Sequence, residues 1–82
     1  MHKLCEMKVG EIVEVKSLEA KDLLKERLMA LGLVKGSKVK IIRKGPKDNL
    51  VVYKIRGAMI ALRKEEASLV YVISNKASSK NK

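Results

Sequence analysis

Apolar and polar residues alternate over several short stretches of this chain, and each such stretch predicts a β-strand. Val13 and Val15 lie on one face of the first predicted strand, at residues 12–16. Further short stretches, alternating or continuously apolar and set between turn-forming residues, predict strands at residues 38–44, 50–56, 58–63 and 69–73. The strands at 50–56 and 58–63 are so close that we expect a hairpin turn at Arg56–Gly57.

A helical period replaces the alternation between residues 20 and 31. The apolar residues here are spaced as on one helix face, namely Ala20, Leu24, Leu28 and Leu31, with Leu23 widening the stripe. Gly32 follows at the position where a helix commonly ends in a left-handed residue. Residues 64–68 leave room for a single further helical turn.

Five short strands with one helix inserted after the first favour a small closed barrel or sandwich over a βαβ layout. The fold class expected is therefore mainly β with one inserted helix, a small SH3-like five-stranded barrel. We assign this domain to residues 1–73. Residues 74–82 consist of Ser, Asn and Lys with a single Ala, and we expect them to form a disordered basic tail.

The charge of the chain is strongly positive and unevenly distributed. Nineteen basic and nine acidic residues give a net charge of +10, and residues 21–44 alone hold eight basic and two acidic residues. A lone cysteine, Cys5, fits a reducing compartment. No targeting signal and no apolar run long enough to span a bilayer are visible in the sequence, so we expect a cytoplasmic protein.

Residues able to carry catalysis or bind metal are few. His2, Cys5 and Glu6 lie close together and could hold iron or zinc, but structural metal sites usually show four ligands with paired spacing. We therefore interpret this trio as part of a frayed terminus and expect no metal site and no cofactor. Cys5 also lacks the partners of a catalytic triad.

The remaining catalytic candidates are equally weak. Paired carboxylates occur only at Glu65–Glu66, beside Arg63 and Lys64, which we interpret as a solvated turn. Gly32 and Gly36 do not form a phosphate-binding loop, because the Lys-Ser/Thr ending is missing. The sequence predicts no enzyme.

Nucleic-acid binding is the alternative that the basic segment keeps open. A cationic face attracts phosphates, but small barrels usually read single strands by stacking bases on aromatic side chains. This chain has only two aromatic residues, Tyr53 and Tyr71, and the alternation of its strand places Tyr53 inward. Any binding to DNA or RNA should therefore be independent of sequence. The same shortage of aromatics excludes the polyproline groove of other SH3-type domains.

Two stretches of the chain resemble the ferrous iron transport protein A (FeoA) family over about Met7 to Val72. The first runs from Arg27-Leu28 through Leu31-Gly32 to Gly36, and the second from Gly57 through Ala61-Leu62-Arg63 to Glu66-Ala67. The family positions that we take as structural are Arg27, Leu28, Gly32, Gly36, Gly57, Leu62 and Arg63. The central turn departs from the family pattern, with Asn49 where a second Pro is common.

The resemblance implies a small SH3-like cytosolic protein that supports a membrane ferrous iron transporter of the FeoB type, at its cytosolic face. It implies neither catalysis nor a fixed metal site, and we expect at most weak self-association. The same fold also ends the chain of iron-dependent repressors, so a stand-alone relative of that domain is a second alternative. No DNA-binding helices precede the predicted barrel, which favours the transport role.

The predicted helix offers a surface for docking a partner. If the apolar stripe faces the barrel, Lys21, Lys25 and Met29 lie on or near the outer faces, at spacings of four. Lys35 in the following loop and Lys38 at the start of the next strand could extend this surface. We expect these five residues to attract an acidic patch on the transporter, mainly by raising the association rate.

Overall fold

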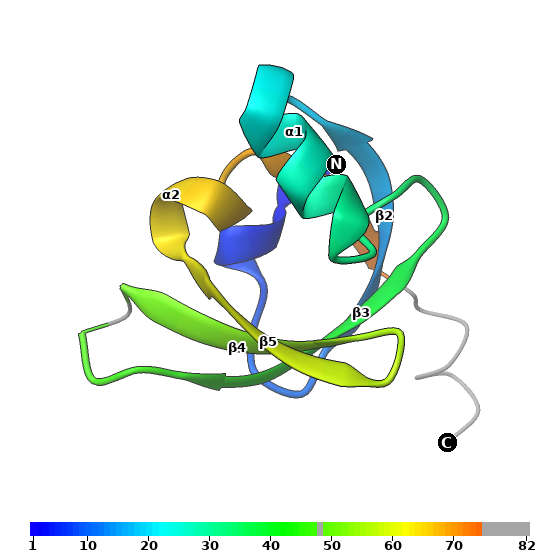
Figure 1. Cartoon of the computed structure of the whole chain (residues 1–82). Coiled ribbons are helices and arrows are strands. Elements are labelled where there is room, and N and C mark those ends of the chain that lie inside the picture. The colour runs from blue at the N-terminus through cyan, green and yellow to red at the C-terminus, as the bar shows by residue number, and fades with distance from the viewer. Residues whose placement is uncertain (48, 75–82) are drawn as a thin grey trace.

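The structure is a computed structural model that describes residues 1–47 and 49–74 (Figure 1). Its strands are β1 (His2–Lys3), β2 (Ile12–Leu18), β3 (Lys38–Lys44), β4 (Leu50–Ile55), β5 (Ala58–Arg63) and β6 (Val70–Ser74). Its helices are the 3₁₀ turn η1 (Leu4–Glu6), the α-helix α1 (Asp22–Ala30) and the short α2 (Lys64–Ala67). The protein is thus mainly β with one substantial inserted helix, as predicted.

All the strands of the described residues belong to one antiparallel sheet, in the order β1-β6-β2-β3-β4-β5. The register shifts between Val15 and Ser17 on β2 and between Ile41 and Arg43 on β3, and such bulges strengthen the local twist of a strand. The sheet curls around the core (Figure 1). The expectation of a closed five-stranded barrel is corrected: residues 1–47 and 49–74 form six strands, and β1 and β5 are two edges that are not hydrogen-bonded to each other.

The sixth strand comes from the N-terminal residues, which we had interpreted as frayed. His2 and Lys3 pair with Val72 and Tyr71 of β6, and Leu4 is fully buried. The backbone N–H of Lys3 donates a hydrogen bond of 3.0 Å to the Glu6 carboxylate, which stabilises the 3₁₀ turn. Because β1 has only two residues and both are exposed, it shows no alternation from which a strand could have been predicted.

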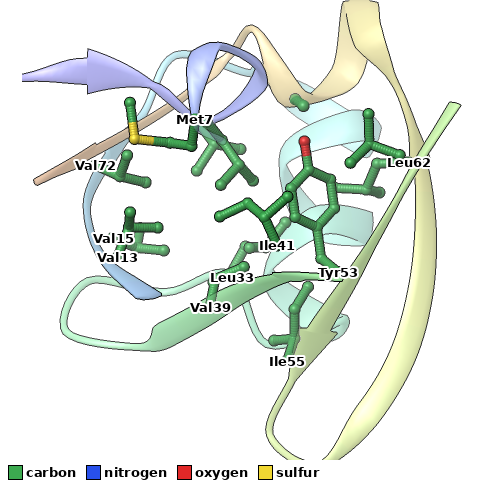
Figure 2. Packing of buried hydrophobic residues seen from close by; sticks show 14 of the residues in the cluster. Met7, Val13, Val15, Leu33, Val39, Ile41, Tyr53, Ile55, Leu62 and Val72 are labelled. Carbon is green, nitrogen blue, oxygen red and sulfur yellow. The ribbon is translucent and has the colours of Figure 1, made fainter. Parts of the chain in front are cut away.

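The core fills the inside of the curled sheet with aliphatic side chains, the thioether of Met7 and one tyrosine (Figure 2). Val13 and Val15 are buried from β2, as the alternation predicts. The fully buried residues of the next strands are Val39, Ile41, Tyr53, Ile55 and Leu62, with Val70 and Val72 from β6. Burial raises the pKa of the Tyr53 hydroxyl well above its ordinary value, and the nearby Cys5 adds to the effect.

Helix α1 is shorter than predicted and begins without a side-chain cap at Lys21. Leu28 is fully buried, but Leu23, expected to widen the apolar stripe, is 79% exposed. Leu23 and Leu28 are five residues apart, about 140° around the helix, so both cannot face the same core. The helix end was predicted correctly: Gly32 has a φ of +108°. The N–H of Gly32 donates to Met29 O and that of Leu33 to Leu28 O, the pattern of a Schellman motif.

The tight turn at Arg56–Gly57 is confirmed as the connection between β4 and β5. Arg56 and Gly57 have φ values of +52° and +83°, as a two-residue hairpin turn of the mirror-image type requires. The single helical turn after β5 is also present, as α2. Ser74, which we had assigned to the tail, is the last residue of β6. The rest of the predicted tail, residues 75–82, lies outside the described residues.

Candidate functional site

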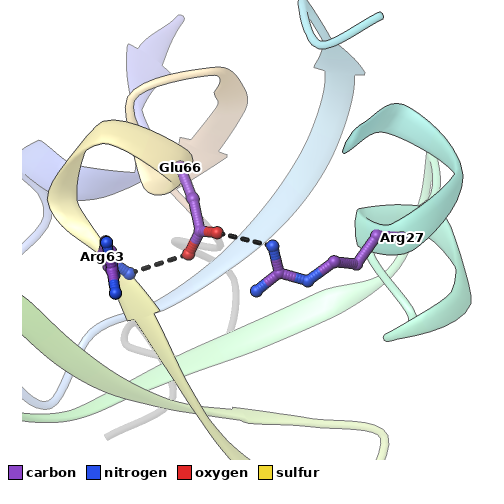
Figure 3. A network of polar contacts seen from close by, with 3 residues as sticks. All are labelled: Arg27, Arg63 and Glu66. Carbon is purple, nitrogen blue, oxygen red and sulfur yellow. Dashed lines mark hydrogen bonds and ion pairs between the residues drawn. The ribbon is translucent and has the colours of Figure 1, made fainter. Parts of the chain in front are cut away.

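The two family stretches meet in space through a carboxylate between two arginines (Figure 3). One oxygen of Glu66 lies 2.8 Å from the Arg27 guanidinium, and the other accepts a hydrogen bond of 3.0 Å from the backbone N–H of Arg63. Glu66 is on α2 and Arg27 on α1, 39 residues apart in the sequence. The contact therefore ties the inserted helix to the short helix that follows β5.

The environment of Glu66 favours its ionised form. The hydrogen bond from the Arg63 backbone is the main cause that lowers the pKa of this carboxyl. Partial burial raises the pKa, whereas the hydrogen bond and the charge of Arg27 lower it further. The side chain of Glu66 is only 14% exposed, against 58% for Arg27. Our interpretation of Glu65–Glu66 as a solvated turn is wrong for Glu66, which has a structural role. The sequence contained only half of the usual signal, since Glu66 has the N3 position of a capping box but Arg63 stands where Ser or Thr is usual.

The glycines of the first stretch allow the chain to turn from α1 into β3. A Cβ on Gly32 would lie 2.8 Å from Cγ2 of Ile55, so the helix end packs on β4 at a distance that excludes a side chain. The Ser37 hydroxyl donates a hydrogen bond of 2.7 Å to the Gly32 carbonyl. The N–H of Gly36 donates to Val15 O at 2.8 Å, which fixes the loop to β2.

The other motif residues also occupy structural positions. Leu28 and Leu62 are fully buried and belong to the same core cluster. Gly57 completes the β4–β5 turn, and Arg63 precedes α2. Arg27, Leu28 and Gly32 of the family motif thus coincide with the contacts that position α1.

The five predicted docking residues fall into two groups. Lys21 is the residue before the first turn of α1, and Lys25 and Met29 follow on the helix; all three are exposed, Met29 to 42%. Lys35 and Lys38 line a shallow hollow beyond the end of the helix. Arg56 lines the same hollow, and the sequence analysis did not select it because only the hairpin brings it beside the loop.

The N-terminal trio does not gather into a metal site. The Glu6 carboxylate is bonded to the backbone of Lys3, His2 is exposed, and Cys5 is half-buried near Tyr53. Within residues 1–47 and 49–74, no three His, Cys, Asp or Glu side chains are arranged to hold a metal ion. Over the same part of the chain, no helix has the length and apolarity needed to cross a membrane.

The aromatic residues offer no stacking surface to a nucleic acid. Tyr53 is fully buried, as predicted from the alternation of its strand, and Tyr71 is half-buried on β6. Exposed cations without exposed aromatics can attract phosphate but cannot hold bases by stacking.

The family model of the FeoA domain matches residues 2–74 of this chain. The chain therefore belongs to the FeoA family. A comparison with curated proteins gives no match.

Solved FeoA proteins share the fold. The solution structure of FeoA from Chlorobium tepidum superimposes with a TM-score of 0.83 at 36% identity, covering 89% of this chain and 70% of the other. FeoA from Stenotrophomonas maltophilia, solved with zinc and described as an SH3 domain protein, gives a TM-score of 0.78 at 31% identity, with 89% and 91% coverage. The fold is therefore SH3-like.

A manganese-dependent transcriptional repressor has the same fold over part of its length. It matches with a TM-score of 0.80 at 16% identity, over 89% of this chain and 41% of the repressor. At this level of identity, the likeness concerns the fold alone.

Proposed function

We propose that this protein is a small cytoplasmic accessory of a ferrous iron transporter of the FeoB type, and that it acts by protein–protein contact without catalysis. Membership of the FeoA family is the observation that carries this proposal. The relative from Stenotrophomonas maltophilia is described as possibly acting as a bacterial ferrous iron transport activating factor, which supports the same role.

The docking face that we propose comprises Lys21 at the start of α1 and Lys25 and Met29 on the helix, extended by Lys35 and Lys38. Three features support it. The residues are exposed, they are cationic around a flexible thioether, and the Arg27–Glu66 contact holds the helix against the rest of the domain. A helix fixed in this way can present its outer face with little loss of entropy on binding.

Ferrous iron uptake tests the proposal, in a strain that lacks its own FeoA protein. We expect the variant Lys21→Glu/Lys25→Glu/Met29→Asp to abolish support of uptake while circular dichroism shows an intact fold. The matched control is Lys40→Glu/Lys54→Glu/Leu23→Asp, which makes the same change in charge and also replaces one exposed apolar residue of α1. Normal uptake with the folded first variant would exclude this face, and no effect of the wild-type protein on uptake would exclude the function.

A further inference from the structure

The end of the β3–β4 hairpin combines exposed apolar side chains with a group of cations. Leu50, the first residue of β4, is 46% exposed. It lines three adjoining hollows, whose other linings include Pro46, Lys44, Lys47, Arg63 and Lys64. We call these six residues the hairpin tip. In Figure 1 the hairpin projects beside α2, away from α1.

The charge of this region is positive on both strands that meet there. Residues 43–50 and 63–65 together carry five basic and two acidic residues, a net charge of +3. Leu50 pairs with Arg63 across β4 and β5, and the N–H of Lys64 donates to Asn49 O at 2.9 Å. These contacts hold two cations, Arg63 at the end of β5 and Lys64 at the start of α2, beside the apolar end of β4.

We propose that the hairpin tip binds directly to the surface of a membrane rich in anionic lipid. Lys44, Lys47, Arg63 and Lys64 would contact headgroup phosphates, and Leu50 and Pro46 would lie between the headgroups. An anionic bilayer complements both features, because it attracts clustered Lys and Arg and takes up aliphatic side chains at its interface. This contact needs no transporter, so it goes beyond the proposed function.

A nucleic acid fits the hairpin tip less well. It would complement the cations, but Leu50 and Pro46 cannot stack on bases. Binding to phosphates alone should also be insensitive to removal of the Leu50 side chain. This difference separates the two ligands experimentally.

Co-sedimentation with lipid vesicles tests the proposal. We expect the wild-type protein to bind vesicles of equal parts phosphatidylglycerol and phosphatidylcholine, and not vesicles of phosphatidylcholine alone. Each lysine close to an anionic surface raises the affinity about fivefold, so Lys44→Glu/Lys47→Glu should weaken binding roughly 25-fold or more. Leu50→Ala should weaken it about fivefold through lost insertion, without changing the charge.

The charge-matched control is Lys40→Glu/Lys54→Glu, on the same two strands. Lys40 and Lys54 are register partners, and Lys40 lies four residues, about 13 Å, from Lys44. That distance exceeds the screening length of about 10 Å at 0.1 M salt, so we expect a much smaller effect from this control. Equal losses from both pairs would overturn the proposal in favour of unspecific attraction by net charge.

A fluorescent probe gives a second measurement that does not depend on charge reversal. In a Cys5→Ser background, an environment-sensitive dye on Asn49→Cys should shift to the blue when anionic vesicles are added, whereas the same dye on Lys54→Cys should not. Equal shifts at both positions would overturn the proposal, as would full binding by Leu50→Ala. Binding of a DNA duplex that is as tight as vesicle binding and unaffected by Leu50→Ala would assign the tip to nucleic acid instead.

Discussion

Replacement of Gly32 by alanine should destabilise the protein more than the same change at Gly36. Both glycines have positive φ, +108° and +93°, at which a Cβ costs about 1–2 kcal/mol. Around Gly36 a Cβ would meet nothing within 4 Å, but at Gly32 it would lie 2.8 Å from Cγ2 of Ile55. Ile55 is fully buried and β-branched, so it cannot turn aside easily. Relief of this overlap should add about 1–3 kcal/mol.

We therefore expect Gly36→Ala to cost about 1–2 kcal/mol and Gly32→Ala about 2–5 kcal/mol. A domain of this size has a total stability of roughly 4–12 kcal/mol, so the second loss is a large fraction. Urea unfolding, followed by circular dichroism, measures the free energy of unfolding of both variants. We expect the two variants to share the same slope of this free energy against urea concentration. Equal losses within about 0.5 kcal/mol would refute the close approach of the helix end to β4.

Three further predictions concern the core, the carboxylate contact and the metal. Leu28→Ala, at a fully buried position, should lower the unfolding free energy by about 2–5 kcal/mol. Leu23→Ala, at a position 79% exposed, should change it by no more than about 0.5 kcal/mol. Equal effects of the two variants would contradict the orientation of α1, which buries Leu28 and exposes Leu23. Glu66 has a lowered pKa, so its stabilisation is present above the unfolded pKa of about 4.3 and is lost as the pH falls through the folded value. Glu66→Gln should therefore flatten the acid limb of stability against pH, and an unchanged acid limb would contradict the contact. Anaerobic calorimetric titration with Fe²⁺ should show weak or no binding, and a one-to-one sub-micromolar site lost in His2→Ala or Cys5→Ser would contradict this.

The regular elements could be predicted from the sequence because their signals are local. The bounds of β3 follow from period-two alternation, those of β5 from a short apolar run after Gly57, and the β4–β5 turn from Arg56–Gly57 between two apolar runs. The end of α1 follows from Gly32, since few other residues adopt its φ. In each case neighbouring residues alone determine the backbone.

Features that depend on distant partners could not be predicted. β1 forms because the backbone of His2 and Lys3 pairs with β6, about 70 residues later in the chain. The role of Glu66 depends on Arg27, which only the folded chain brings within 2.8 Å. The exposure of Leu23 could not be predicted, because it depends on the rotation of α1 about its axis. The broad apolar stripe did not define that rotation.

The sequence indicated only in part which exposed residues the fold groups together on its surfaces. The sequence singled out the cations of α1 and of its loop, but not Arg56, which joins Lys35 and Lys38 through the β4–β5 turn. The β3–β4 connection was interpreted from the sequence only as a turn. The grouping of Leu50 with Arg63 and Lys64 depends on strand register, because Leu50 and Arg63 are partners across β4 and β5.

Direct binding to the soluble cytosolic domain of the ferrous iron transporter is the most decisive measurement of the central claim. The account predicts saturable binding by the wild-type protein that weakens with salt. It also predicts loss of that binding in Lys21→Glu/Lys25→Glu/Met29→Asp and its retention in the charge-matched control with Lys40→Glu, Lys54→Glu and Leu23→Asp. No binding by the wild-type protein, or equal binding by both variants, would contradict the account.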